Sequence, residues 1–305
     1  MNIQEIKSYS YHFFKLLTKG YSDKLLGISV DITNKCNLKC KHCYWWENRE
    51  SKELSDNEWI KLVKKIKKEN PYIIQGFWLG GEPLLRAKLL EKLFKYFKLN
   101  SVITNAVLPL PRWSNVNFTV SMDGIEKDYE KIRGKGVYKK VKKNILKNKD
   151  LDLHLSCTLN KINFCNIDEF VKEWYDNQVQ GLNFTIHTEI KGGNKSIGFS
   201  LKERDKVIDK IIMLKSKYNN FIYGSKSHYH SMKSKTCKKA AYWCRQHYAK
   251  MGMCLDSMGK VKKPCIFGPI ANCDYCGCPL PYIMYAAKNK DLSAMLDTLK
   301  HNVFK

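Results

Sequence analysis

Three cysteines lie close together early in the sequence, in the segment CNLKCKHCYW. Three residues separate Cys36 from Cys40, and two separate Cys40 from Cys43. Thiolates at this spacing can ligate three irons of a 4Fe–4S cluster and leave the fourth iron open to a substrate or cofactor. A zinc site completed by a ligand elsewhere, for example His42, is the alternative. The aromatic residue directly after Cys43 favours the iron–sulfur interpretation.

A second group of cysteines occupies the last quarter of the chain. Seven of the twelve cysteines fall there, at Cys237, Cys244, Cys254, Cys265, Cys273, Cys276 and Cys278. Dense cysteine in a reducing compartment indicates metal binding or catalysis rather than disulfides. The segment CDYC forms a close chelating pair, so we expect iron–sulfur or zinc binding here. Cys157 and Cys165 stand apart, and we interpret them as ordinary residues, with Cys157 in mid-strand as a small hydrophobe.

The elements that must position these cysteines alternate in type. β-branched runs such as LGISVDIT and LDLHLSCTLN predict strands, and amphipathic runs such as LSDNEWIKLVKKIKKEN predict helices, this one capped by Ser55. Strand and helix alternate at least five or six times between residues 27 and 217, which predicts an α/β fold with a parallel sheet. The polar motifs follow strands, at the sheet edge where ligands bind.

The two ends of the chain depart from this pattern. Residues 3–18 predict an amphipathic helix with an apolar stripe that packs on the domain or, alternatively, lies on a membrane. After about residue 218 the pattern breaks, and residues 224–280 look too irregular for a core of their own without metal. Residues 282–302 predict a closing helix.

Several motifs together resemble the radical S-adenosylmethionine (SAM) superfamily. CNLKCKHCY resembles its cluster signature, and GGEP at residues 80–83 resembles its motif for the SAM amino group. SMDG at 121–124, then IRGKG and CTLNKIN, resemble the SAM-binding elements of members with a C-terminal cluster extension. LDSMGKVKKPC resembles the hairpin of the SPASM and twitch extensions. The resemblance covers residues 27–190 well and 237–280 loosely.

This resemblance implies a partial (β/α)6 barrel of the radical SAM type with a small cysteine-rich C-terminal extension. The divisions would be an N-terminal helix at 1–26, a radical SAM core at 27–220, and an auxiliary-cluster extension with its closing helix at 221–305. The catalytic 4Fe–4S cluster would cleave SAM reductively to a 5′-deoxyadenosyl radical, which abstracts hydrogen from a substrate or adds to it. A ferredoxin or flavodoxin would supply the electron, in an oxygen-free cytoplasm. The resemblance names no catalytic side chain.

The resemblance also implies roles for individual residues. Tyr44 would lie against the adenine, Gly80 and Gly81 would let the backbone approach the methionine moiety, and Glu82 would bind its ammonium group. Candidates for ribose and carboxylate contacts are Ser121, Asp123 and Asn160, for which turn formation is the alternative. A second 4Fe–4S cluster would use Cys254, Cys265, Cys273 and Cys276, with Cys244 and Cys278 in reserve. The tract is shorter than a full SPASM domain and spaced differently, so the choice of ligands stays open.

The substrate is the least determined feature of the sequence. Relatives with auxiliary clusters often modify peptides or proteins, so peptide modification is the first hypothesis. A lipid or isoprenoid substrate is the alternative, suggested by the apolar N-terminal helix, the basic surface and the tryptophans Trp45, Trp46 and Trp78 near the cluster loop. A non-enzymatic zinc protein that binds nucleic acid is a third hypothesis, and it makes GGEP and SMDG coincidental.

Charge bears on partners rather than on the reaction. The chain carries 54 Lys and Arg against 29 Asp and Glu, a formal net charge of +25. This excess favours an anionic partner such as a membrane surface, although lysines scattered along solvated helices explain it equally well. No signal peptide or spanning segment is predicted, so we expect a cytoplasmic protein, peripheral on the membrane if that contact forms.

Overall fold

The computed structural model describes residues 3–45, 52–191, 197–289, 291 and 294. Among these residues eight strands form one sheet in the order β6-β5-β4-β3-β2-β1-β7-β8. Neighbours from β6 through β7 run parallel, whereas β7 and β8 form an antiparallel hairpin. The strands are Gly27–Asp31 (β1), Gln75–Leu79 (β2), Leu99–Thr104 (β3), Val116–Ser121 (β4), Leu153–Leu159 (β5), Leu182–Ile186 (β6), Gly252–Leu255 (β7) and Val261–Lys262 (β8).

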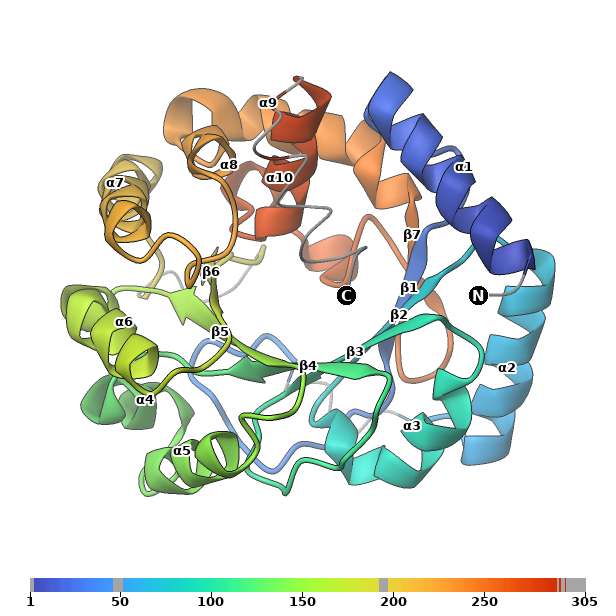
Figure 1. The fold of residues 1–305 in the computed structure, drawn as a ribbon, viewed down its shortest axis with the longest axis horizontal. Coiled ribbons are helices and arrows are strands. Elements are labelled where there is room, and N and C mark those ends of the chain that lie inside the picture. Colours follow the sequence, from blue (N-terminus) through green and yellow to red (C-terminus); the bar gives the residue numbers. More distant parts are fainter. Residues whose placement is uncertain (1–2, 46–51, 192–196, 290, 292–293, 295–305) are drawn as a thin grey trace.

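Helices connect these strands and surround the sheet (Figure 1). They are Ile3–Lys19 (α1), Asp56–Glu69 (α2), Ala87–Phe94 (α3), Glu126–Arg133 (α4), Tyr138–Lys147 (α5), Ile167–Asp176 (α6), Leu201–Lys217 (α7), Lys226–Ser231 (α8), Ser234–Gln246 (α9) and Pro279–Lys288 (α10). The predicted cap of α2 is confirmed: Ser55 accepts from the Glu58 backbone, and the Glu58 carboxylate accepts from the Ser55 backbone. The mostly parallel sheet and the helices around it confirm the predicted α/β partial barrel.

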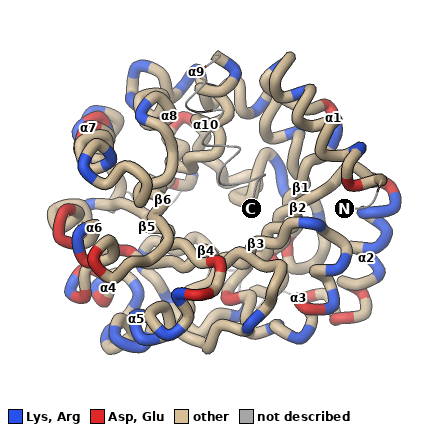
Figure 2. The backbone as a smooth tube through the Cα atoms, viewed as in Figure 1, with Lys and Arg blue, Asp and Glu red and all other residues tan. Residues whose placement is uncertain are grey.

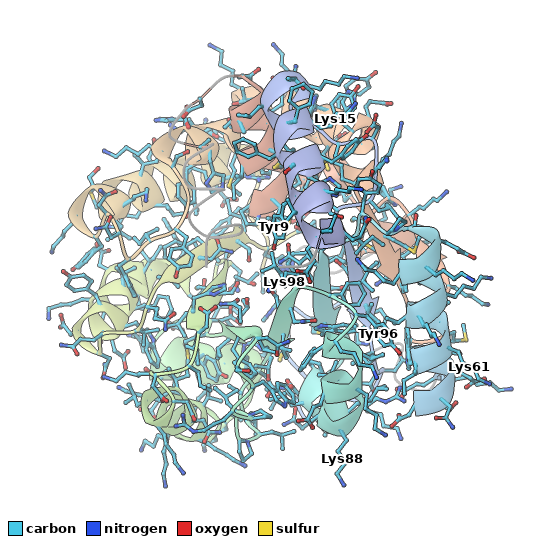
Figure 3. The ribbon with its side chains drawn as sticks, turned by 45° about the vertical axis from the view of Figure 1, so that its right-hand side comes forward. Tyr9, Lys15, Lys61, Lys88, Tyr96 and Lys98 are labelled. Atoms are coloured by element: carbon cyan, nitrogen blue, oxygen red, sulfur yellow. The ribbon has the colours of Figure 1, made fainter. Side chains whose placement is uncertain are left out.

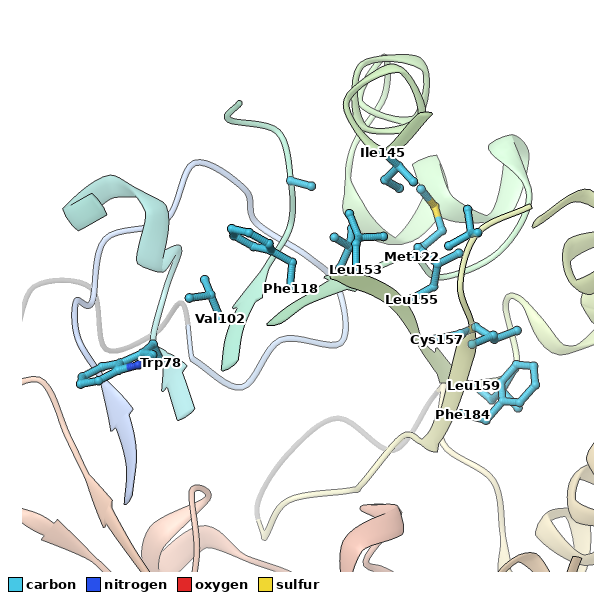
Figure 4. Close-up of a cluster of buried hydrophobic side chains, with 14 of the residues drawn as sticks. Trp78, Val102, Phe118, Met122, Ile145, Leu153, Leu155, Cys157, Leu159 and Phe184 are labelled. Atoms are coloured by element: carbon cyan, nitrogen blue, oxygen red, sulfur yellow. The ribbon is translucent and has the colours of Figure 1, made fainter. Parts of the chain in front are cut away.

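Each strand from β2 to β6 has one face toward the helices and one face away from them. Positions alternate between buried and partly exposed along these strands. The buried set packs with the helices in one continuous core (Figure 4), where Leu153 and Met122 lie near Ile145 of α5. Cys157 belongs to this core, as predicted, and Cys165 is exposed. The sheet thus separates a dry outer layer from an inner face.

The C-terminal segment joins the two edges of the six-stranded parallel core. Strand β7 extends the sheet beyond β1, with Cys254 opposite Ser29. At the other edge, the Ile186 backbone of β6 donates to the carbonyl of Gly277 at 3.0 Å. A Cβ added to Gly277 would lie 1.7 Å from the Ile186 carbonyl oxygen, so this approach requires glycine. The late cysteine tract therefore runs from one edge to the other.

Three expectations need correction or remain open. The expected irregularity after residue 218 was wrong for 226–246, which form α8 and α9. Helix α9 buries Cys237, Ala240, Ala241 and Trp243, and the first three are small residues that give a weak apolar signal. The closing helix begins at Pro279 and ends at Lys288, and residues 290, 292–293 and 295–302 of that prediction lie outside the described residues. The domain divisions at 26/27 and 220/221 stay predictions. None of the described helices has the length and apolar character needed to cross a membrane.

Candidate metal centre

The first cysteine loop follows the carboxyl end of β1 and rests directly on the GGEP segment. The Gly81 backbone donates to the Thr33 carbonyl at 2.7 Å, and the Glu82 backbone donates to the Lys35 carbonyl at 2.8 Å. Gly80 has a φ of +124°, and a Cβ on Gly81 would lie 2.1 Å from the Lys35 oxygen. Both glycines are therefore needed to let the two loops touch. Their predicted approach to the methionine moiety stays a prediction.

Glu82 ties the GGEP segment to the end of β3. Its carboxylate is buried, with Oε1 accepting from Thr104 Oγ1 at 2.7 Å and from the Leu84 backbone at 3.1 Å. Oε2 accepts from the Asn105 backbone at 2.8 Å. Burial raises the pKa of Glu82, and these hydrogen bonds act in the opposite direction. The observed contacts give Glu82 a positioning role, and its contact with an ammonium group stays a prediction.

Every sulfur of the first loop has a nitrogen donor within 4 Å. The pairs are Asn105 Nδ2 with Cys36 Sγ at 3.9 Å, Arg133 Nη1 with Cys40 Sγ at 3.8 Å, and the Trp45 backbone N with Cys43 Sγ at 3.3 Å. Donors of this kind stabilise thiolates and the sulfurs of iron–sulfur clusters. Burial raises the pKa of Cys40 to about 11, and Cys43 and Cys36 contribute to the shift, so the three thiols lie within electrostatic range.

Asp123 holds in place Arg133, the cation beside Cys40. Its Oδ2 accepts from Arg133 Nε at 2.6 Å, and its Oδ1 accepts from the Thr158 backbone at 2.7 Å. The Asp123 side chain is fully buried, and His42 Nε2 lies 3.6 Å from Oδ2. Burial lowers the pKa of His42 to about 4, against the opposing effect of Asp123. The carboxylate thus joins β4 and β5 to the cluster loop through Arg133.

The other two residues predicted to contact SAM, Asn160 and Ser121, differ in their surroundings. Asn160 is buried, its Oδ1 accepts from the Ile162 backbone at 2.9 Å, and its Nδ2 donates to the Thr158 carbonyl at 3.1 Å. These contacts form a turn, which was the alternative interpretation for this residue. Ser121 ends β4 on the partly exposed face, paired in register with Ser156. Of the two, Ser121 has the side chain that faces inward.

Tyr44 lies between the first loop and the late cysteine tract. Its ring centroid is 4.6 Å from that of Phe267. Burial raises the pKa of Tyr44 well above its usual value, and the groups that raise it further are Asp31, Cys43, Cys265 and Cys254. Tyr44 therefore contacts the tail side of the loop, while its predicted contact with adenine stays a prediction.

Each of six late cysteines lies within electrostatic range of at least one other. Burial raises the pKa of Cys244, and Cys276, Cys265 and Cys273 raise it further. Burial likewise raises the pKa values of Cys254, Cys276 and Cys278, in each case with Cys265 contributing. Cys237 is buried, and its Sγ lies 3.6 Å from the Ser234 carbonyl in its own helix. The predicted set therefore has Cys244 and Cys278 as neighbours.

The two cysteine groups fit iron–sulfur clusters by the chemistry of their donors. Each offers three or more thiols, and the first also offers nitrogen donors to every sulfur. Within the described residues, no three His, Cys, Asp or Glu side chains already surround one point in metal-binding geometry. The ligand assignments thus stay predictions that rest on sequence spacing and proximity.

Sequence reasoning missed three side chains that hold these sites. Arg133 and Asn105 contact the first loop, and Arg204 Nη2 donates to the Cys276 carbonyl at 2.5 Å. Arg204 is buried and lies 3.3 Å from the Tyr282 hydroxyl. Arg133 stands inside IRGKG and Asn105 inside ITN, so the motifs gave a signal for both. Arg204 sits in an ordinary amphipathic helix and gave none.

The inner face of the sheet changes character from one side to the other. On β2 and β3 the partly exposed positions include Phe77, Leu79, Leu99 and Ile103. On β4, β5 and β6 all eight are polar: Asn117, Thr119, Ser121, His154, Ser156, Thr158, Asn183 and Thr185. Hydrogen bonds of 3.0 Å join Thr119 to His154 and Thr185 to Thr158. This half of the inner face suits a ligand with many hydrogen-bonding groups.

Comparison with known proteins identifies a family domain. The model of the radical SAM superfamily matches residues 30–173, from β1 through most of α6. Residues 30–173, just under half of the chain, therefore carry a radical SAM domain. Proteins of this superfamily use a 4Fe–4S cluster and SAM, and the match supports an enzyme of that kind.

Three similar proteins illustrate the range of the superfamily. The sporulation killing factor maturation protein SkfB of Bacillus subtilis is 28% identical over 182 residues, 52% of this chain and 42% of SkfB. A probable GTP 3′,8-cyclase of Methanococcus maripaludis is 32% identical over 168 residues, 50% of this chain and 54% of that protein. The chain thus spans about half the length of these relatives. Streptococcus suis SuiB, solved with its precursor peptide SuiA, has a TM-score of 0.64 at 16% identity, covering 96% of this chain and 71% of SuiB.

Proposed function

We propose that this radical SAM enzyme modifies a peptide. The observation that carries the proposal is the all-polar inner face of β4, β5 and β6. The carboxyl ends of these parallel strands lie at the same edge of the sheet as the cluster loop, which follows β1. An extended peptide presents a donor and an acceptor at every residue, which such a face can satisfy. SkfB matures a sporulation killing factor and SuiB binds a precursor peptide, which supports the same substrate class.

The lipid alternative loses one of its supports in the structure, and the polar inner face of β4 to β6 stands against it. Trp78, proposed as part of an apolar approach to the cluster, is fully buried and donates to Asn100 Oδ1 at 3.0 Å in the outer core. A long apolar tunnel would need apolar residues on the inner faces of β4 to β6, where the structure has polar ones. Trp46 lies outside the described residues.

Within this proposal the two cysteine groups have separate roles. When bound, the cluster of the first loop supplies the electron that cleaves SAM to a reactive carbon radical. Cys36, Cys40 and Cys43 would hold it, and Arg133 would place positive charge beside it. Cys254, Cys265, Cys273 and Cys276 would hold a second cluster, with Cys244 and Cys278 within electrostatic range of that set. A ferredoxin or flavodoxin remains the proposed electron donor.

The test uses anaerobically reconstituted enzyme with dithionite and SAM. Synthetic peptides encoded by small reading frames beside the gene are compared with GTP and with isoprenoid lipid in vesicles. We expect one peptide to raise the rate of 5′-deoxyadenosine formation and to change in mass. Turnover of GTP or of the isoprenoid, without any change in a peptide, would refute the proposal.

A variant of the inner face links that result to the structure. Ser156→Leu should remove stimulation by the peptide and keep the slow cleavage of SAM seen without substrate, because the change blocks the face and leaves the cysteine loop intact. Ser156→Thr keeps the hydroxyl and serves as the matched control. Equal peptide turnover by both variants would place the substrate elsewhere.

A further inference from the structure

Helix α1 is attached to the protein through its polar side. Ser8 and His12 are buried, at 1% and 2% exposure. His12 Nε2 lies 2.9 Å from the Tyr72 carbonyl and His12 Nδ1 lies 2.9 Å from Ser22 Oγ. An amphipathic helix of a globular protein ordinarily buries its apolar side instead. The sequence prediction that the apolar stripe packs on the domain was thus wrong for most of the stripe, although Leu16 is partly buried.

The opposite side of α1 is apolar and exposed. Exposure is 73% for Ile3, 50% for Ile6, 43% for Phe13, 64% for Phe14 and 49% for Leu17. At 100° per residue these five side chains fall on one arc of the helix, which also holds Ser10, Lys7 and Thr18. We call these five residues the α1 stripe. They make up half of the large exposed hydrophobic side chains found among the described residues, which marks an interaction site.

Charge indicates what covers the α1 stripe. The arc carries Lys7 and no acidic residue, while Glu5, partly buried, lies on the opposite side of the helix. Lys15 and Lys19 lie toward the opposite side of α1, where Lys15 pairs with Asp23 at 3.2 Å, and Figure 2 shows further basic positions along the neighbouring α2. Figure 3 shows Lys15 and Lys61 projecting from these two helices. A second copy of a chain with a net charge of +25 would be repelled, whereas an anionic bilayer attracts juxtaposed lysines.

The dimensions of α1 suit a helix that lies in the plane of a membrane surface. Ile3 and Leu17 are 14 residues apart, about 21 Å along the axis. Tyr72, which anchors α1, precedes β2, so α1 lies toward the amino ends of β1 and β2. The first cysteine loop follows the carboxyl end of β1. Contact through α1 therefore leaves the cluster side of the sheet free.

We infer that the α1 stripe inserts into the interfacial layer of an anionic lipid bilayer and that the surrounding lysines contact the lipid headgroups. The rigid polar anchoring of α1 keeps the apolar side chains outward in the absence of a membrane. Association then needs no rearrangement of the fold, and it combines burial of phenylalanine with electrostatic attraction. The inference is independent of the substrate.

Cosedimentation with vesicles tests this inference on reconstituted holoenzyme. Vesicles of phosphatidylcholine with 30% phosphatidylglycerol, about one anionic lipid in three, are compared with pure phosphatidylcholine. The wild type should bind the anionic vesicles at least tenfold more strongly, and the double variant Phe13→Ser/Phe14→Ser should lose at least tenfold in affinity. Met213→Ser, which removes a side chain of 53% exposure from α7, is the matched control and should bind as the wild type does.

Two further measurements make every outcome decisive. Basal SAM cleavage and melting temperature should be the same in all three proteins, which excludes misfolding as the cause of a loss. Failure of the wild type to bind anionic vesicles, or equal binding by the double variant, overturns the inference. A wild-type dimer by light scattering that becomes monomeric in the double variant also overturns it, and assigns the stripe to a second copy of the chain.

Discussion

The two cysteine regions differ in how much of their surroundings regular structure supplies. The first loop follows β1, whose Ile28 and Val30 are fully buried, and it is held by groups from the ends of β2, β3 and β4. The late tract crosses from β7 to α10 through short turns such as Cys273–Tyr275. Its apolar support beside α9 and α10 is a small cluster centred on Trp243, Met251 and Met284.

This difference suggests two ways of building a metal site. The first loop has its hydrogen-bond donors in place because the sheet positions them, so the cluster adds chemistry to a site that is already formed. The late tract has many thiols and little core, so we expect metal ligation to supply much of its order.

Removing the ligands should separate the two regions completely. Cys36→Ala/Cys40→Ala/Cys43→Ala should abolish 5′-deoxyadenosine formation and reduce iron from about eight to about four per chain. Cys265→Ala/Cys273→Ala should also lose about four irons, yet it should lower the melting temperature more, because the tail loses its cross-link. Iron analysis, product chromatography and calorimetry provide the readouts.

The exposed Cys165 supplies the control for the cysteine variants. Cys165→Ala should match the wild type in iron content, product formation and melting temperature. Full iron content in the Cys265→Ala/Cys273→Ala variant would contradict the second site as proposed.

Two glycines offer a matched steric test of the same contrast. A Cβ on Gly81 would lie 2.1 Å from the Lys35 oxygen, and one on Gly277 would lie 1.7 Å from the Ile186 oxygen. Gly81→Ala should displace the first loop and reduce SAM cleavage by orders of magnitude. Gly277→Ala should detach the tail from β6 and lower its cluster content, while cleavage of SAM without substrate persists.

Gly252→Ala is the control, because the added Cβ would lie an ordinary 3.9 Å from the nearest atom, the Gly27 oxygen. We expect the control to keep the iron content and the rate of the wild type. Equal loss of SAM cleavage in Gly81→Ala and Gly277→Ala would show that the two regions form one cooperative site.

Acid should weaken the C-terminal region through His228. This histidine of α8 is buried, and burial, with a smaller effect from Lys215, lowers its pKa to about 3. Because the unfolded chain binds the proton near pH 6.5, the contribution of His228 to stability is lost as the pH falls from 6.5 toward 3. The slope for one such proton is about 1.4 kcal/mol per pH unit.

Urea unfolding between pH 7.5 and 5.5 measures this effect. His228→Gln should unfold with a smaller dependence on pH than the wild type, whereas His230→Gln, at an exposed position of the same helix, should not change the dependence. Identical pH dependence in all three proteins would exclude His228 as the source of acid sensitivity.

The sequence predicted the parts of the molecule that depend on local pattern. Alternation in LDLHLSCTLN gave β5, and the Ser55–Glu58 pair gave the start of α2, because period and capping are local properties. The order of motifs after strands placed the cluster loop at the correct edge of the sheet. The fold class followed from the repetition of these units.

The missed features depend on proximity between distant residues. Gly277 meets Ile186 and Arg204 meets Cys276, pairs separated by about 70 to 90 positions in the chain. The inverted orientation of α1 depends on partners for His12 that only the folded chain provides. Helix α9 was missed because three of its four buried residues are alanine or cysteine, and Trp243 alone of the four gives a strong apolar signal.

The central claim is that the open iron belongs to the first loop and not to the late tract. Electron paramagnetic resonance of dithionite-reduced protein tests it directly, with and without SAM, in the two cysteine variants. The Cys265→Ala/Cys273→Ala protein should show a cluster signal that shifts when SAM is added. The Cys36→Ala/Cys40→Ala/Cys43→Ala protein should show a signal that SAM leaves unchanged. A SAM-dependent shift in the second protein, with none in the first, would contradict the claim.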